Sequence, residues 1–255
     1  MTGAVAGRLT GLRAAITGGS SGIGAATARE FAARGVRVVI AGRSAAALDR
    51  VAAETNAAVV LGDLREPGCA QRIIDAAVGD LGGLDVLVSN AGIGWAGPFA
   101  SMSDSDIDAL LDVNLRAAAH LARAAIPHLR GGRGRLVFVG SIAGLVGVPG
   151  ETWYSATKAG LGCFADALRA ELRPTGIGVS LVSPGVVDTA YFERRKEPYR
   201  RRYPRLISAE TAAAAVVNAV EHGRDDVVVP PWLSLPARVK VSFPGLYRLL
   251  ASRLA

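Results

Sequence analysis

Short runs of β-branched and other apolar residues alternate with longer segments rich in Ala, Leu, Arg and Glu along most of the chain. The short runs predict strands at residues 13–17, 36–41, 58–61, 86–89, 136–140, 179–182 and 227–229. The longer segments predict helices, for example over residues 25–34, 44–55, 103–129, 153–172 and 209–222. Apolar strands that alternate with helices are typical of a parallel sheet covered on both faces. We therefore expect an α/β fold: a doubly wound, Rossmann-type domain with a seven-stranded, mostly parallel sheet.

A single domain is expected to span residues 1–255, because no low-complexity linker divides the chain. Within it, residues 188–207 are expected to form a substrate loop and residues 230–255 a C-terminal extension. The chain is 50% hydrophobic and 20% charged, which fits a folded domain with a substantial core.

Nothing in the sequence predicts a membrane span or a secretory signal. No apolar run reaches the roughly 20 residues that a span requires, and the first residues lack a charged segment followed by an apolar one. Cys69 and Cys163 have no metal-ligand spacing, so we expect reduced, buried thiols, no metal site and a cytoplasmic protein.

A glycine-rich turn, Thr17-Gly-Gly-Ser-Ser-Gly-Ile-Gly24, follows the first predicted strand and opens the first helix. Its glycines permit a tight turn and a close approach of the backbone to a ligand, and the helix N-terminus offers free amides to a pyrophosphate. An ordinary strand–helix turn is the alternative. The cofactor contacts expected here are Gly18, Ser20, Ser21, Gly22, Ile23 and Gly24.

The end of the second strand bears on the choice of dinucleotide. An NAD site usually places an acid there to bind the ribose 2′-hydroxyl, whereas this chain has Gly42 and Arg43. A guanidinium suits a 2′-phosphate, so NADP is favoured over NAD; a solvated arginine is the alternative. After the third strand, Asp63 and Leu64 are expected at the adenine edge, although Asp63 could equally cap a helix.

A Tyr–Lys pair, Tyr154 and Lys158, lies four residues apart in a predicted helix, so both side chains share one face. A nearby positive charge favours a phenolate and lowers the pKa of a tyrosine. Such a tyrosine can exchange a proton with a substrate near neutral pH.

The motifs, taken in order, resemble those of the short-chain dehydrogenase/reductase family. The similarity runs from about Gly11 to Val229. Its motifs are the glycine turn; Asn90-Ala91-Gly92, preceded by Ser89 where many relatives carry another Asn; Asn114; Ser141; Tyr154 with Lys158; and Pro184-Gly185, followed by Thr189.

The resemblance implies a catalytic set of Asn114, Ser141, Tyr154 and Lys158. Tyr154 would exchange the proton of the reacting oxygen, and Ser141 would hydrogen-bond the same oxygen. Lys158 would hold the nicotinamide ribose and lower the pKa of Tyr154, and Asn114 would anchor a water in a proton relay. The plainer alternatives are a strand-end hydroxyl or helix cap for Ser141 and a backbone hydrogen bond within its helix for Asn114.

The same resemblance completes the expected cofactor site. Asn90, Ala91 and Gly92 would shape the backbone near the cofactor, and Pro184 and Gly185 the turn that faces the nicotinamide. Val187 lies in the same segment, and Thr189 would hydrogen-bond the carboxamide or a phosphate. Tyr154 and Lys158 are counted among the cofactor contacts as well.

These residues predict an NADP(H)-dependent oxidoreductase that interconverts a secondary alcohol and a ketone on a lipophilic or amphipathic small molecule. A catalytically silent dinucleotide-binding sensor or scaffold of the same fold is the alternative. The resemblance further implies a homodimer or homotetramer built on the helices over residues 103–129 and 153–172.

Two basic segments lie outside these motifs, in a chain whose net charge is +7. Residues 194–205 carry Arg194, Arg195, Lys196, Arg200, Arg201, Arg202 and Arg205 against the single acid Glu197. This run could be a solvated lid, meet the acidic end of an amphipathic substrate, or contact an anionic membrane. No nucleic-acid module accompanies the charges, so no nucleic acid is expected.

The C-terminal extension mixes apolar and basic residues. A short helix would place Leu246, Leu249, Leu250 and Leu254 on one face, with Arg248 and Arg253 elsewhere. It could dock on a membrane, cover a lipophilic pocket, or pack against its own domain or a neighbouring subunit.

Overall fold

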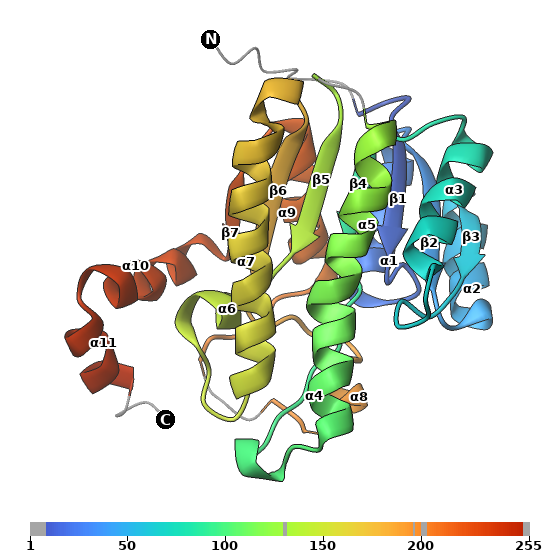
Figure 1. Cartoon of the computed structure of the whole chain (residues 1–255). Helices are drawn as coiled ribbons and strands as arrows, with labels where there is room; N and C mark the ends of the chain where they lie inside the picture. Colours follow the sequence, from blue (N-terminus) through green and yellow to red (C-terminus); the bar gives the residue numbers. More distant parts are fainter. Residues whose placement is uncertain (1–8, 130–131, 196, 200–202, 252–255) are drawn as a thin grey trace.

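The computed structural model describes residues 9–129, 132–195, 197–199 and 203–251 (Figure 1). Seven parallel strands form one sheet in the order β3-β2-β1-β4-β5-β6-β7, which confirms the doubly wound fold and makes every strand pair parallel. The strands are β1 (Arg13–Thr17), β2 (Arg37–Gly42), β3 (Ala58–Leu61), β4 (Val86–Ser89), β5 (Arg135–Val139), β6 (Gly178–Pro184) and β7 (Asp226–Val229).

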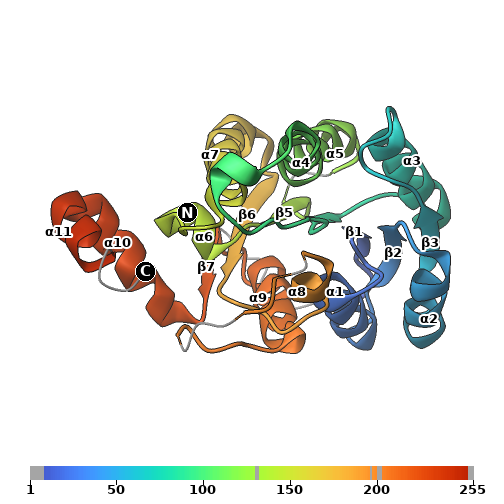
Figure 2. The same cartoon turned by 90° about the horizontal axis from the view of Figure 1, so that it is seen from below.

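Helices cover both faces of the sheet (Figure 2). One face carries α3 (Cys69–Leu81), α5 (Ala117–Ala125) and α7 (Thr152–Leu172); the other carries α1 (Gly22–Ala33), α2 (Ala45–Thr55) and α9 (Ala209–Glu221). Successive strand residues point to opposite faces, so Leu136 and Phe138 join the first core while Val137 joins the second. Both cores are apolar, which is why the strands read as nearly continuous apolar runs.

The helical segment predicted over residues 103–129 is confirmed, but it is not one regular α-helix. It consists of α4 (Asp104–Leu111), a π-helical segment η2 (Asp112–Arg116), α5 and a 3₁₀ turn η3 (Ile126–His128) that contains Pro127. A π segment holds an extra residue in its turn. Here it carries Asn114, whose buried side chain bonds to the segment after β4 rather than to its own helix.

The strand order reverses between β1 and β4, since β1 lies between β2 and β4 in the sheet. In open α/β sheets, ligands bind beyond the carboxyl ends of the strands at such a switch point. The segments that follow β1, β4, β5 and β6 therefore meet at one edge of the sheet.

The C-terminal extension forms two helices, α10 (Ser234–Ser242) and α11 (Pro244–Ala251), which project past the β7 edge (Figures 1 and 2). Lys240 Nζ donates to the Leu145 carbonyl at 3.0 Å, and Tyr247 donates to the Val146 carbonyl at 3.1 Å. Both acceptors lie on α6 (Ile142–Val146). The short helix expected near the C-terminus is thus present as α11, with α10 as a further helix before it, and the predictions for Arg253 and Leu254 fall outside the described residues.

The remaining short elements are η1 (Phe99–Ser101), η4 (Arg173–Thr175), α8 (Tyr191–Arg194) and η5 (Pro231–Leu233). Among the described residues, no helix is long and apolar enough to cross a membrane. Cys69 is buried as predicted, but Cys163 is exposed on α7, which corrects that prediction; both are free thiols.

Candidate active site

A cavity of about 1130 Å³ opens at the carboxyl ends of the strands. All of the predicted site residues line it except Gly24 and Asn114. One end is formed by the glycine turn and the ends of β2 and β3; the other is lined by apolar side chains that include Val146, Val186 and Leu233.

The glycine turn has the backbone that a ligand-binding turn requires. Gly18 and Gly22 have φ values of +67° and +54°, a region that favours glycine. A Cβ on Gly24 would overlap the Gly18 carbonyl oxygen, so Gly24 serves the packing of α1 against the turn. Gly22 lies against Thr189, because a Cβ on Gly22 would be 3.1 Å from Thr189 Cγ2.

The Asn90 side chain ties the end of β4 to this turn. Its Nδ2 donates to the Thr17 carbonyl at 2.9 Å, while the amides of Asn90 and Ala91 donate to Thr17 Oγ1 at 3.1 and 3.2 Å. The motif that begins at Asn90 thus holds the backbone of the turn. Together with the open cavity, this geometry fits a dinucleotide whose pyrophosphate lies against the start of α1.

Arg43 lies at the far end of the cavity beside Asp63. Its side chain is 57% exposed, and Nη1 is 3.9 Å from Asp63 Oδ2. Arg65 binds the same carboxylate at 2.6 Å and holds the pKa of Asp63 below its ordinary value. Asp63 also accepts from the Arg65 amide at 3.0 Å, and α3 begins only at Cys69, so Asp63 forms a turn rather than a helix cap.

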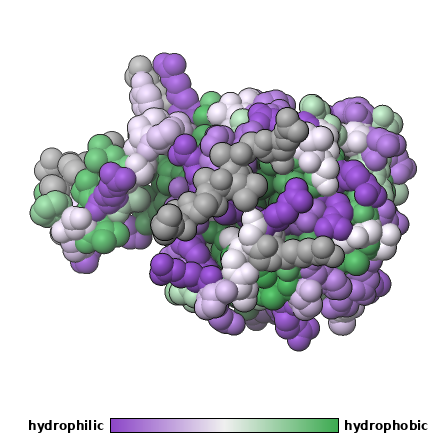
Figure 3. Space-filling view, turned by 90° about the horizontal axis from the view of Figure 1, so that it is seen from above, coloured by the Kyte–Doolittle hydropathy of each residue, from purple (hydrophilic) through white to green (hydrophobic). Residues whose placement is uncertain are grey.

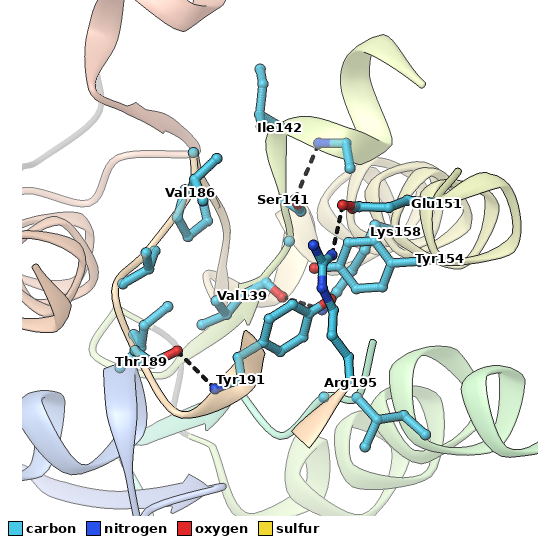
Figure 4. Close-up of a pocket in the computed structure, with 18 of the residues that line it drawn as sticks. Val139, Ser141, Ile142, Glu151, Tyr154, Lys158, Val186, Thr189, Tyr191 and Arg195 are labelled. Carbon is cyan, nitrogen blue, oxygen red and sulfur yellow. Dashed lines mark hydrogen bonds and ion pairs between the residues drawn. The ribbon is translucent and has the colours of Figure 1, made fainter. Parts of the chain in front are cut away.

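Tyr154 and Lys158 lie on one face of α7 and both line the cavity (Figure 4). Lys158 Nζ is 5.9 Å from the centre of the Tyr154 ring and donates to the Val139 carbonyl at 2.9 Å. Burial of Lys158 lowers its pKa to about 8, because the charged form loses its hydration.

The expected lowering of the Tyr154 pKa is wrong for the protein alone. Burial raises the pKa of Tyr154, and this effect outweighs the lowering by the neighbouring Ser141 and Tyr191 hydroxyls. The Lys158 ammonium group donates its hydrogen bond to the Val139 carbonyl at the end of β5. It does not contribute to lowering the pKa of Tyr154.

Ser141 caps a helix, as the plainer alternative predicted, and its hydrogen bond to a reacting oxygen stays a prediction. Its Oγ accepts from the Ala143 amide at 3.1 Å, which makes it the N-cap of α6. The same hydroxyl faces Tyr154 and lines the cavity.

Asn114 lies behind the cavity wall. Its Oδ1 accepts from the Ile93 amide at 2.9 Å, and its Nδ2 donates to the Ile93 carbonyl at 3.0 Å and to Thr157 Oγ1 at 3.2 Å. A Cβ on Gly92 would lie 3.2 Å from Asn114 Oδ1 and 3.5 Å from Lys158 Nζ, so these three residues meet. A water relay through Asn114 stays a prediction.

The segment after β6 is fixed by neighbouring strands and the C-terminal extension. The Gly185 amide donates to the Val229 carbonyl at 2.7 Å, and Val187 forms a bridge with Ile207. A Cβ on Gly185 would lie 2.6 Å from Leu233 Cδ1. Pro184, Gly185, Val187 and Thr189 are thereby held along one wall of the cavity.

Sequence reasoning missed a cluster of Glu151, Tyr191 and Arg195 beside Tyr154 (Figure 4). Arg195, expected within the basic loop, is only 5% exposed and pairs with Glu151 at 2.6 Å. Its guanidinium lies 4.7 Å from the centre of the Phe192 ring and 5.7 Å from that of Tyr191. The aromatic residues interleaved with the arginines were the available signal, but nothing in one sequence distinguishes the buried arginine from the others.

Other candidates lie away from this site. Trp153, expected either at the pocket or in the core, donates from Nε1 to the Ile107 carbonyl at 2.9 Å and does not line the cavity. Lys196, Arg200, Arg201 and Arg202 fall outside the described residues. In the part of the chain that the structure describes, no cluster of three His, Cys, Asp or Glu side chains could hold a metal ion.

Comparison with known proteins gives consistent matches. A family model described as "short chain dehydrogenase" matches residues 13–200. The chain is 34% identical to the ketoacyl reductase HetN of Nostoc sp. over 87% of this chain and 79% of that protein.

Two solved structures are similar over most of their length. A short chain dehydrogenase from Burkholderia cenocepacia in complex with NADP has a TM-score of 0.79 and 35% identity, covering 88% of this chain and 98% of that one. A short chain dehydrogenase/reductase from Burkholderia phymatum in complex with NAD has a TM-score of 0.84 and 25% identity, covering 94% and 96%.

Proposed function

The chain belongs to the short-chain dehydrogenase family of NAD(P)-dependent oxidoreductases acting on CH–OH groups, and on that premise we propose a specific activity. The protein interconverts a secondary alcohol and a ketone on a lipophilic or amphipathic substrate, using NADP(H). The observation that carries the proposal is the convergence of Ser141, Tyr154 and Lys158 on a cavity whose other end is the glycine turn. The apolar end, near Val186 and Leu233, supports a lipophilic substrate.

The chemistry that NADPH supplies when bound is transfer of a hydride to the carbonyl carbon. Tyr154 donates its phenolic proton to the oxygen on which negative charge develops. Ser141 donates a hydrogen bond to the same oxygen and fixes its position. Lys158, held at the foot of the cavity with its pKa near 8, is placed to bind the ribose hydroxyls and to return a proton to Tyr154.

Arg43 supports the choice of NADP. A largely exposed guanidinium at the end of β2 offers a charge-assisted contact to a 2′-phosphate. Asp63 is bound by Arg65, which leaves its carboxylate less suited to a ribose hydroxyl. Similar structures carry NADP in one case and NAD in another, so the preference rests on Arg43.

The Tyr154→Phe variant tests the activity. We expect kcat to fall by about 10²- to 10⁴-fold, the usual contribution of a general acid, while NADPH binding by fluorescence titration stays unchanged. Turnover at the wild-type rate in this variant would refute the role of Tyr154. If the wild type itself oxidised no NADPH with a broad ketone panel but still bound it, the sensor alternative would be favoured.

The proposal extends to a peripheral contact with anionic membranes. Trp232, Leu235, Val241 and Phe243 are 55%, 64%, 82% and 62% exposed on the projecting extension, where Figure 3 shows apolar and hydrophilic side chains side by side. Residues 230–255 hold four Lys or Arg residues and no acid. Basic and apolar side chains together are typical of surfaces that lie in a lipid interface.

A vesicle co-sedimentation assay separates this contact from the competing occupant, a second copy of the chain. A Val241→Glu, Phe243→Glu double variant should lose binding to phosphatidylserine vesicles, with neutral vesicles as the control. If it instead changed the molar mass measured by light scattering, the face would be a subunit interface. A homodimer or homotetramer in the cytoplasm completes the proposal.

A further inference from the structure

Tyr191 presents a second phenol to the reacting centre. It begins α8, where its amide donates to Thr189 Oγ1 at 3.3 Å. Its ring centre lies 6.0 Å from that of Tyr154, and Figure 4 shows both rings side by side in the cavity. The Tyr191 hydroxyl is buried and has no hydrogen bond of acceptable geometry within the described residues.

An unsatisfied buried hydroxyl is costly, so its position calls for a physical reason. The hydroxyl faces that of Tyr154 closely enough for each to influence the pKa of the other. It also contacts the backbone after β4: a Cβ on Gly94 would overlap the Tyr191 hydroxyl, so only glycine leaves it room.

The surroundings hold Tyr191 firmly in this place. Arg195 lies over its ring at 5.7 Å, and its amide donates to the Tyr191 carbonyl at 3.1 Å. The buried Arg195–Glu151 ion pair then fastens α8 to the start of α7, one turn before Tyr154. A side chain fixed in this way is pre-organised for a partner that arrives from the cavity.

We propose that the Tyr191 hydroxyl donates a hydrogen bond to a second oxygen of the substrate, next to the carbon that is reduced. The substrate class is then a ketone oxygenated on the neighbouring carbon, such as a vicinal diketone or an α-hydroxyketone. The inference rests on the proposed oxidoreductase function and narrows its substrate. Tyr154 and Ser141 receive the reacting oxygen, and Tyr191 receives its neighbour.

The two phenols are suited to different roles. Burial raises the pKa of Tyr191 well above its ordinary value, and the neighbouring Tyr154 and Glu151 raise it further. Tyr191 therefore keeps its proton and acts as a hydrogen-bond donor. It is a specificity-determining residue, while proton exchange belongs to Tyr154 beside Lys158.

The test compares two ketones of one skeleton, benzil and deoxybenzoin, of which only benzil has the second oxygen. Their intrinsic reactivities differ, so the informative quantity is the change in their kcat/KM ratio between wild type and Tyr191→Phe. We expect this ratio to fall about tenfold, the upper range for one neutral hydrogen bond, with deoxybenzoin turnover retained. Gly94→Ala, which displaces the same hydroxyl, should lower the ratio in the same direction.

The Tyr199→Phe variant is the matched control. Its phenol belongs to the same aromatic cluster, with its ring 5.8 Å from Phe192, but its hydroxyl donates to the Pro204 carbonyl at 2.8 Å. It should leave the ratio unchanged. A ratio equal to wild type in Tyr191→Phe would overturn the inference.

A binding measurement separates this failure from failure of the proposed function. If neither ketone is reduced, calorimetric titration of benzil and deoxybenzoin into the NADP-saturated protein decides the inference. A benzil affinity lowered only by Tyr191→Phe would support it. Equal affinities in both proteins, or no benzil binding, would overturn it.

Discussion

The Glu151→Gln substitution probes how firmly α8 is held over the cavity. Glu151 pairs with Arg195 at 2.6 Å, and the two side chains are 20% and 5% exposed. The variant keeps the side-chain shape and removes the charge. Arg195 would then remain a cation between the rings of Tyr191 and Phe192 without its counter-ion.

The magnitude follows from the burial of the pair. Removing one partner of a fully buried ion pair costs about 3–5 kcal/mol, whereas an exposed pair contributes about 0–1 kcal/mol. Because Glu151 is one-fifth exposed, we expect about 2 kcal/mol for local opening of the segment that carries Arg195. At 1.36 kcal/mol per decade, the opened population rises about 30-fold.

Limited trypsin digestion measures this opening, since trypsin cleaves after Lys and Arg and residues 194–205 hold six arginines and one lysine. When opening is fast relative to cleavage, the cleavage rate follows the opened population. Cleavage in this segment should therefore be about 30-fold faster in Glu151→Gln.

Glu197→Gln provides the control, because it removes an exposed carboxyl group from the same segment. Arg195 donates to the backbone carbonyl of Glu197, and the substitution leaves that carbonyl in place. Its cleavage rate should match that of the wild type. Unchanged cleavage in Glu151→Gln, or equal acceleration by the control, would refute the idea that the ion pair fastens α8.

Three further substitutions test the cofactor end and the foot of the cavity. Arg43→Ser should lower the NADPH-to-NADH ratio of kcat/KM about tenfold, the lower range for a charge-assisted hydrogen bond; Arg37→Ser, at the other end of β2, should not change it. Gly24→Ala should weaken NADPH binding at least about tenfold by titration, because a Cβ there overlaps the Gly18 carbonyl; Gly79→Ala, open to solvent in α3, should bind normally. Burial lowers the pKa of Lys158 to about 8 in the folded protein, so above pH 8 the unfolded chain binds more protons than the folded one. The free energy of unfolding should therefore rise by about 2 kcal/mol between pH 8 and 10. Urea unfolding of the cofactor-free protein measures this rise, and a slope in Lys158→Met equal to that of the wild type would contradict it.

The sequence predicts the strands well because their apolar runs are buried on both faces. The bounds of β1, β3 and β4 agree with the predicted ranges, and the other strands shift by one or two residues. The division of the helix over residues 103–129 could not be predicted, because Asn114 turns away from its helix to reach Ile93, a contact made only in the folded chain.

In the candidate site, too, the position of the residues could be predicted from the sequence, but their environment could not. Motif residues such as Ser141, Tyr154 and Thr189 line one cavity, since strand ends of a parallel sheet meet at one edge. The environment of each group was harder to predict. Whether Tyr154 is a stronger or weaker acid depends on burial, and whether Arg195 faces water depends on Glu151, which lies 44 residues away in sequence.

The π-helical segment over Asp112–Arg116 separates what the fold needs from what the site needs. A one-residue deletion there can be absorbed, because closing the wide turn gives an ordinary α-helix that leads into α5 with its buried face in place. The same deletion would withdraw Asn114 from Ile93 and from the wall behind Lys158. A shortened chain of this kind should fold and melt nearly as the wild type does while losing activity, so the extra residue serves the site rather than the stability of the fold.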